Sequence, residues 1–264
     1  MTRRVLILFF SLALFCLQAS AQTVDEIVKK SIDARGGIQK IKAVKTLKAT
    51  AKVIPAGLGQ EIPIVIQQKR PNSARIDVTF QGKSQIQAYD GETAWKIDSI
   101  QGSSEPEKVT GEELKQMQEQ ADMDGSLVDY KEKGNTVELI GKEDLEGTPV
   151  YKLKVTLKTG DVRYFYLDAG NYLELKVTSK RQIPGGEVEL DNYLGNYKSV
   201  NGILMAHSIE NKVKGQTVSQ ITIEKVELDV PIDDSIFKMP APAKPQEKPK
   251  TEEKPKDKPP SSSR

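Results

Sequence analysis

The side chains that most often carry chemistry are few in this sequence. His207 is the single histidine and Cys16 the single cysteine, so no set of histidines and cysteines can assemble a zinc site. His207 falls on a predicted strand over residues 204–210, where a lone histidine is typical of a packed or surface residue. The sequence also lacks a Gly-x-Ser-x-Gly elbow, a Walker loop and a dinucleotide fingerprint. We therefore predict no enzyme, no catalytic residue, no metal site and no cofactor.

Charged side chains leave one enzymatic alternative open. Acidic residues number 37, so a carboxylate pair for glycoside hydrolysis is conceivable, although most of them lie on polar strand faces or in turns. The 39 lysines and arginines are interspersed with the acids and form no basic stripe. This pattern indicates that nucleic acid is not a partner.

Residues 1–21 have the layout of a secretory signal peptide. Two arginines precede an apolar run, and small residues at 19–21 suit a signal peptidase. The run is short against a bilayer core of about 30 Å, which disfavours the alternative of an uncleaved anchor. Cleavage after residue 21 would remove Cys16, leave a chain without thiols and place it in the periplasm.

Residues 240–264 differ in composition from everything before them. They are rich in proline and lysine and contain no large apolar residue. Such a segment cannot bury enough surface to offset the entropy of ordering, so we predict a disordered tail. It either solubilises the protein or reaches peptidoglycan or anionic head groups. Residues 22–239 remain as one predicted domain.

Two helices are predicted within this domain, over residues 23–35 and 110–123. Thr23 and Glu26 have the spacing of a capping box, and so do Thr110 and Glu113. The first helix has an apolar face and ends at a pair of glycines, after which a short helical turn follows. The second helix is too polar for a core and is either a lid across a concave sheet or a surface helix.

The rest of the domain alternates apolar and polar residues with a period of two. The clearest example is residues 151–157, where Tyr151, Leu153 and Val155 alternate with lysines and threonine. Turn signals recur at hairpin spacing, which predicts an antiparallel meander of about ten strands. A sheet this wide must curl, because strand twist accumulates. The predicted fold class is mainly β (α+β), a curled antiparallel meander with an N-terminal and a mid-chain helix.

Several short motifs resemble the LolA-like superfamily of periplasmic lipoprotein carriers. They are Lys69-Arg70-Pro71, then Tyr89-Asp90-Gly91 with Trp95 shortly after, Tyr166-Leu167-Asp168, Asn201-Gly202-Ile203, Ile232-Asp233-Asp234, and Phe237 to Pro240. The chain is longer than a typical carrier, so the resemblance is to a divergent branch. It implies an incomplete β-barrel with the two helices as a lid over an apolar cavity. It also implies acyl chains of lipoprotein or lipid as cargo.

The resemblance also assigns roles to residues. It implies that Arg70 hydrogen-bonds to the lid helices and helps to hold the cavity shut; the alternative is a solvated charge at a strand edge. The candidates for the cavity lining are the apolar residues Ile64, Ile66, Ile76, Val78, Phe80, Trp95, Leu153 and Val155. Trp95 has a second interpretation, as a core residue.

The predicted function is a periplasmic lipid or lipoprotein carrier that acts as a monomer. The resemblance implies inner- and outer-membrane lipoprotein-handling proteins as its partners. One alternative is an envelope sensor or scaffold of the same fold that carries no cargo. Another is an outer-membrane barrel, which the missing aromatic girdles and the polar helix disfavour.

Overall fold

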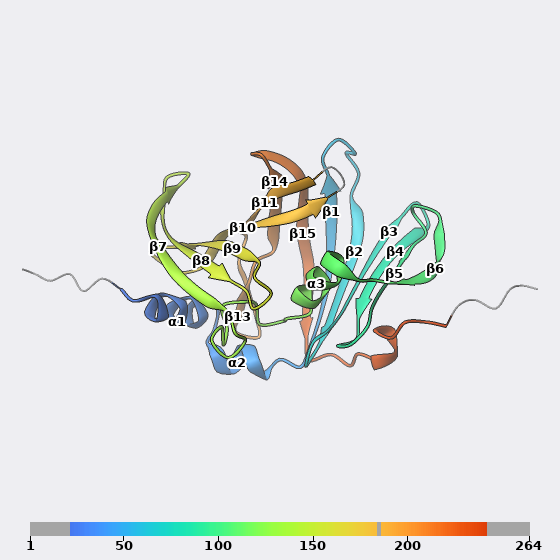
Figure 1. Ribbon diagram of the computed structural model, residues 1–264, viewed down its shortest axis with the longest axis horizontal. Helices are drawn as coiled ribbons and strands as arrows, with labels where there is room; N and C mark the ends of the chain where they lie inside the picture. Colours follow the sequence, from blue (N-terminus) through green and yellow to red (C-terminus); the bar gives the residue numbers. More distant parts are fainter. Residues whose placement is uncertain (1–21, 184–185, 242–264) are drawn as a thin grey trace, which may run out of the picture. The chain divides into compact units, whose positions relative to one another are not determined.

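The computed structural model describes residues 22–183 and 186–241 (Figure 1). The predicted signal peptide and nearly all of the predicted tail lie outside the described residues. Within the predicted domain the chain divides into two compact units. The first unit comprises the residues up to Ala43 and Ser126–Val218, and the second unit comprises Val44–Gly125 and the residues from Ser219 onward.

The first unit is an antiparallel sheet with helices from the start of the described chain. Its strand order is β14-β11-β10-β9-β8-β7. The strands are β7 (Thr136–Leu145), β8 (Thr148–Thr156), β9 (Val162–Asp168), β10 (Glu174–Ile183), β11 (Gly186–Gly195) and β14 (Ser208–Val213). A separate hairpin joins β12 (Lys198–Val200) to β13 (Ile203–Met205), and the helices are α1 (Val24–Ala34) and α2 (Ile38–Ala43).

Helix α1 begins at the predicted capping box. The Thr23 hydroxyl accepts a hydrogen bond from the Glu26 backbone N–H, and the Glu26 carboxylate accepts one from the Thr23 N–H. Ile27 and Val28 are buried against β8 and β9 in the first unit's apolar core. After the helix the chain turns at Gly36, whose φ of +123° favours glycine. The predicted helix, its cap and the short helical turn that follows are confirmed.

The second unit is also an antiparallel sheet, in the order β6-β5-β4-β3-β2-β1-β15. Its strands are β1 (Thr46–Pro55), β2 (Ile62–Lys69), β3 (Ser73–Phe80), β4 (Lys83–Tyr89), β5 (Ala94–Asp98), β6 (Ser103–Lys108) and β15 (Gln216–Leu228), of which the first three residues belong to the first unit. Helix α3 (Gly111–Gln120) follows β6, and the short helix η1 (Asp234–Ile236) follows β15.

Helix α3 confirms the second predicted helix but not its cap. Thr110 precedes the helix in an extended conformation and makes no side-chain cap hydrogen bond. The carboxylate of Glu113 is instead engaged by the Lys96 ammonium, with 2.8 Å between Nζ and Oε2. The predicted capping box at Thr110 is therefore wrong, because a charged partner on β5 takes the acidic side chain that would complete it.

The predicted mainly β fold with a curled, unclosed antiparallel sheet is confirmed. In the part of the chain described, strands β1 to β6 follow one another as neighbours, as do β7 to β11, and the edge strands β6 and β7 each have a single neighbour. The strands of each unit curve visibly in Figure 1. No helix among residues 22–183 and 186–241 combines the length and apolar character needed to cross a membrane.

Candidate functional site

Four strands of the second unit share a continuous apolar face. Ile64 lies opposite Val78, and Ile66 lies opposite Ile76, across the β2–β3 pair. Residues directly opposite one another in an antiparallel pair project from the same side of the sheet. Continuing the register through β1 to β15 extends this surface, which we call the second-unit apolar face. Its members are Ala49, Ala51, Val53, Ile62, Ile64, Ile66, Ile76, Val78, Phe80, Ile221, Ile223 and Val226.

Helix α3 packs on one end of the second-unit apolar face. Met117 and Ala121 are buried against Ala74, Tyr89 and Ala94, which follow the same side of β3, β4 and β5. The side chain of Gln68, on β2, donates a hydrogen bond to the backbone carbonyl of Gln120. Helix α3 thus covers the sheet near the start of β3.

Beyond helix α3 the same face stays partly accessible. Four apolar side chains on β2 and β3 are half-buried: Ile66, Ile76, Val78 and Phe80. Ala49 and Ala51, on the β1 part of the same face, are buried. Alanine side chains are short, so the second-unit apolar face projects less from the sheet at β1 than at its neighbours β2 and β15. A contiguous patch of partly accessible apolar side chains is a common feature of binding surfaces.

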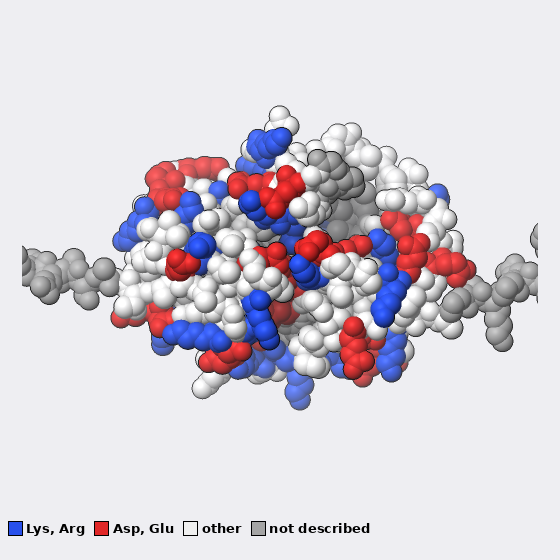
Figure 2. Space-filling model, viewed as in Figure 1, with Lys and Arg blue, Asp and Glu red and all other residues white. Residues whose placement is uncertain are grey.

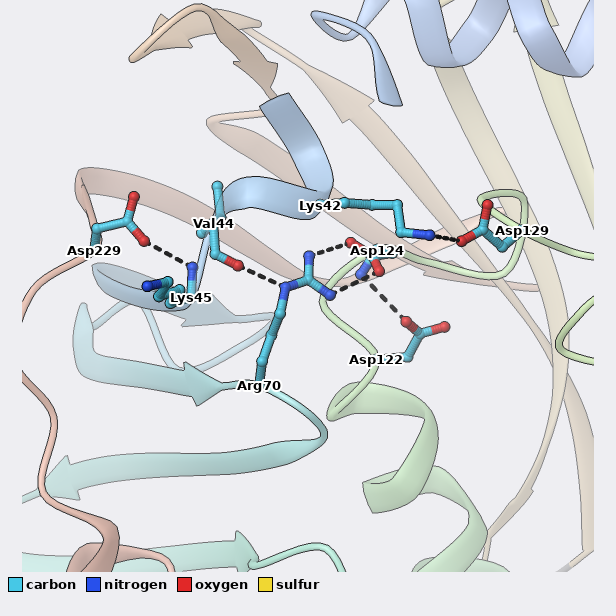
Figure 3. A network of polar contacts seen from close by, with 8 residues as sticks. All are labelled: Lys42, Val44, Lys45, Arg70, Asp122, Asp124, Asp129 and Asp229. Carbon is cyan, nitrogen blue, oxygen red and sulfur yellow. Dashed lines mark hydrogen bonds and ion pairs between the residues drawn. The ribbon is translucent and has the colours of Figure 1, made fainter. Parts of the chain in front are cut away.

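Arg70 lies at the end of β2, and its guanidinium binds a carboxylate through two hydrogen bonds (Figure 3). Its two terminal nitrogens donate to the two oxygens of Asp124, at 2.8 and 2.5 Å, and its Nε donates to the Val44 carbonyl at 2.6 Å. Asp124 follows helix α3, and its backbone N–H donates to the Asp122 carboxylate. The hydrogen bond to Asp124 raises the pKa of Arg70 above its usual value.

The surroundings of Arg70 differ from those of a solvated strand-edge charge. Its side chain is 25% exposed and that of Asp124 is 10% exposed, so the bidentate pair is shielded from water. The pair ties the segment after α3 to the end of β2 and to the residue that begins the second unit. The sequence offered no signal for Asp124 as the partner, because the contact spans 54 positions of the chain.

The structure places Trp95 on the other side of the second unit's sheet. Trp95 lies opposite Ala88 on β4, and Ala88 lies opposite Arg75 on β3. The indole is 1% exposed, donates to the Phe237 carbonyl at 2.7 Å and has the Arg75 guanidinium 5.8 Å from its ring centroid. Trp95 is thus a core residue that holds the segment after η1, separate from the isoleucines with which the sequence grouped it.

Leu153 and Val155 belong to the first unit. Both are fully buried in the core that also contains Ile27 and Val28 of helix α1. The protein's own side chains fill the space around them. Of the eight residues named as cavity candidates, the structure brings together the five on β2 and β3: Ile64, Ile66, Ile76, Val78 and Phe80.

A surface pocket of about 360 Å³ lies in the first unit, between its two helices and residues 127–132. Apolar side chains form part of its lining, and charged residues line the rest of it. On one side Asp129 pairs with Lys42, as Figure 3 shows. The sequence did not suggest this pocket, because its walls come from segments almost 90 positions apart. Its volume is at the small end of the range for ligand pockets.

The single histidine is part of the packed interior. His207 is 4% exposed and its Nδ1 lies 2.9 Å from the Met205 carbonyl, as expected of a packed histidine. No cluster of three or more metal-ligating side chains occurs within the described ranges. Acidic and basic side chains alternate over the face shown in Figure 2.

Comparison with known proteins gives no match in sequence. No protein-family model matches the chain. No curated protein matches it either.

Solved structures do match the fold. A DUF1329 family protein from Desulfovibrio piger is 12% identical, with a TM-score of 0.57, over 81% of this chain and 97% of that one. A LolA superfamily protein from Nitrosomonas europaea is 15% identical, with a TM-score of 0.54, over 83% and 98%. A Vibrio parahaemolyticus domain named for outer membrane lipoprotein sorting is 13% identical, with a TM-score of 0.51, over 80% and 97%. At these identities the similarity shows a shared fold.

Proposed function

From the premise that this chain has the fold of LolA superfamily proteins, we propose that it is a periplasmic carrier that shelters acyl chains on the second-unit apolar face. Its cargo is then a lipid or a lipoprotein. We propose further that the protein is a monomer and catalyses no reaction. Its partners are then lipoprotein-handling proteins of the inner and outer membranes. The predicted signal peptide supports the compartment.

The observation that carries the proposal is the run of half-buried apolar side chains on β2 and β3 next to helix α3. Ile66, Ile76 and Val78 present hydrocarbon on one side of the sheet, and none of them is fully buried by the protein itself. Burying a methylene is worth about 0.8 kcal/mol, so an acyl chain enclosed there would gain on the order of 10 kcal/mol. A membrane offers a similar gain, so transfer between the two is nearly balanced and reversible.

The contact between Arg70 and Asp124 supports a role for α3 as the movable cover. Asp124 lies in the segment that follows helix α3, and Arg70 lies just after the end of β2. An acyl chain that displaces α3 from the sheet would strain or break this bidentate pair. The pair would thus favour the empty closed state and keep the affinity for cargo moderate, which release requires.

The test is the binding of an uncharged apolar dye, Nile red, and of diacylglycerol to the purified periplasmic form. We expect Val78→Asp to weaken both at least about tenfold, because a carboxylate on the face must be desolvated when the ligand binds. Ile54→Asp is the matched control. Ile54 is 36% exposed and lies on β1, one position from Val53 and so on the opposite side of the sheet.

Circular dichroism checks that both variants fold. Absence of dye and lipid binding in the wild type would reject the carrier. Equal losses in the two variants would reject this face as the binding surface. Native mass spectrometry that finds a stable protein partner and no lipid would favour the sensor or scaffold instead.

A further inference from the structure

The side-chain amide of Gln22 lies against two tyrosine side chains of the first unit. Tyr151, on β8, donates a hydrogen bond from its hydroxyl to the amide oxygen. Tyr172, in the turn between β9 and β10, donates to the same oxygen at 3.4 Å and accepts a hydrogen bond from the amide nitrogen at 3.1 Å. The two rings are stacked, with 5.8 Å between their centroids. Both ends of the amide therefore contact phenolic hydroxyls.

The two hydroxyls are held in place by their surroundings. Tyr151 is 6% exposed and belongs to the apolar core that includes helix α1. Lys30, on α1, donates a hydrogen bond to the Tyr172 hydroxyl at 3.2 Å. The hydrogen bonds from Gln22 and Lys30 lower the pKa of Tyr172. The hydroxyl beside the amide nitrogen is therefore a better proton donor than a solvated phenol.

Gln22 is also the residue that the predicted cleavage after residue 21 would leave at the start of the mature chain. Its α-nitrogen would then be an amine instead of part of a peptide bond. The amine and the side-chain carbonyl carbon belong to the same residue, so attack of one on the other is intramolecular and closes a lactam ring. The sequence and the tyrosine contacts thus coincide at one residue.

We propose that Tyr151 and Tyr172 promote the cyclisation of Gln22 to pyroglutamate in the mature chain. The α-nitrogen forms a bond to Cδ, the bond between Cδ and Nε2 breaks, and ammonia leaves. The leaving nitrogen takes a proton from the Tyr172 hydroxyl, and the proton that the attacking nitrogen loses replaces it. No other reactant is consumed. The inference rests on the predicted cleavage and is independent of the cargo.

Each hydroxyl matches a need of this reaction. Negative charge develops on Oε1 as the amine attacks Cδ, and the Tyr151 hydroxyl already donates to this oxygen. The departing nitrogen requires a proton, and the Tyr172 hydroxyl lies 3.1 Å from it. The ammonium of Lys30 is hydrogen-bonded to the same hydroxyl and stabilises the phenolate that forms there transiently.

The product also suits the start of helix α1. An α-ammonium on residue 22 would directly precede the Thr23 cap, where the positive end of the helix dipole disfavours another positive charge. Cyclisation removes this charge. The lactam keeps a carbonyl oxygen, which can still accept a hydrogen bond from Tyr151.

The first experiment determines the N-terminus of the exported protein. The full chain is expressed with its predicted signal peptide, and the N-terminal peptide of the purified periplasmic form is analysed by mass spectrometry. We expect this peptide to begin at Gln22 and to lack the mass of one ammonia. A mature chain that begins at another residue, or at Gln22 with a free amine, overturns the inference.

The second experiment measures the rate of cyclisation. A protease that cuts directly before Gln22 removes an N-terminal fusion partner, and the loss of ammonia is followed with time. We expect the folded chain to cyclise at least about tenfold faster than the same chain unfolded in urea, because unfolding separates the amide from the two hydroxyls. Tyr151→Phe and Tyr172→Phe should each slow the folded chain about tenfold.

Tyr130→Phe is the matched control. The Tyr130 hydroxyl donates to the carboxylate of Asp25 on α1, so this variant also loses a tyrosine hydrogen bond at the helix while the contacts of Gln22 remain. We expect it to cyclise at the wild-type rate, and circular dichroism checks that all three variants fold. Equal rates in the folded and unfolded wild type would mean that the tyrosines only anchor the amide, and would overturn the inference. The Nile red test of the carrier is unaffected by any of these results, so the two proposals can fail separately.

Discussion

Arg70 and Arg163 show how the surroundings of a guanidinium decide what it does. Arg70 has a carboxylate in bidentate contact, which raises its pKa, whereas Arg163 is desolvated beside another arginine, which lowers its pKa. The first arrangement satisfies the charge within the protein and suits a structural latch.

The ion pair between Arg70 and Asp124, which we call the latch, leads to a prediction at the residue scale. Arg70→Leu leaves the Asp124 carboxylate in a site only 10% exposed, so we expect the free energy of unfolding to fall by about 2 kcal/mol. Because the empty closed state loses stability, release of bound Nile red should also become slower. Urea unfolding and stopped-flow fluorescence measure the two effects. Arg70→Lys is the control and should give an intermediate result; release as fast as in the wild type would argue against a latch.

Among the helices and strands, the two N-caps provide a matched pair. Thr23 completes a capping box at α1, whereas Thr110 makes no side-chain cap hydrogen bond at α3. The sequence predicts a capping box at both positions. At α1 the Glu26 carboxylate accepts a hydrogen bond from the Thr23 N–H, whereas at α3 the Glu113 carboxylate pairs with Lys96. Helix α1 is therefore held at its start by its own residues and α3 by its contacts with the sheet.

This difference predicts unequal effects of the same substitution. Thr23→Ala should lower the free energy of unfolding by about 1 kcal/mol, because the Glu26 backbone N–H loses the Thr23 hydroxyl as its hydrogen-bond acceptor at the start of α1. Thr110→Ala should change it by less than about 0.5 kcal/mol. Chemical denaturation followed by circular dichroism gives both values. Equal losses would mean that the Thr110 side chain caps α3 in solution.

At the scale of the whole molecule, two units built from interleaved segments each have a sheet and a helix packed on it. The chain leaves the first unit at Ala43, returns to it at Ser126 and leaves it again after Val218. Trp95 is the only tryptophan in the sequence and lies in the second unit, so its fluorescence reports on that unit. This allows the stability of one unit to be followed separately.

Acid titration of tryptophan fluorescence is expected to show loosening of the segment after η1. Hydrogen bonds from Ser235 lower the pKa of Asp233 from its usual 3.8. Its carboxylate therefore stabilises η1 above pH 3.8, and this contribution is lost as the pH falls through the lower, folded-state pKa. Because the Trp95 N–H donates to Phe237, next to η1, emission should shift to the red at that pH.

Asp233→Asn is the control for this titration. The amide cannot be protonated in this range, so the component of the shift that is due to Asp233 should disappear. A wild-type emission maximum that stays constant down to pH 2.5 would contradict the proposed coupling between the cap and the tryptophan.

Local pattern was sufficient to predict much of this protein. Alternation with a period of two identified β8 and the β2–β3 hairpin, and the capping box located α1. These features depend on residues that are close in the chain. The pleat of an extended strand imposes the period of two, and the geometry of the first helical turn imposes the spacing of the capping box. The short motifs around Arg70 and Trp95 also led to the fold that the solved structures share.

Long-range pairing governed the features that no local pattern contains. Alternation shows which residues of one strand share a side, but not which side an opposing strand or helix will cover; Trp95 and Ile66 were therefore grouped together although they face opposite ways. Arg70 binds Asp124, and Arg163 lies opposite Ser179, because folding brings segments that are distant in the chain next to each other. Contacts of this kind depend on the packing of the entire unit, since many arrangements satisfy the same local periodicity.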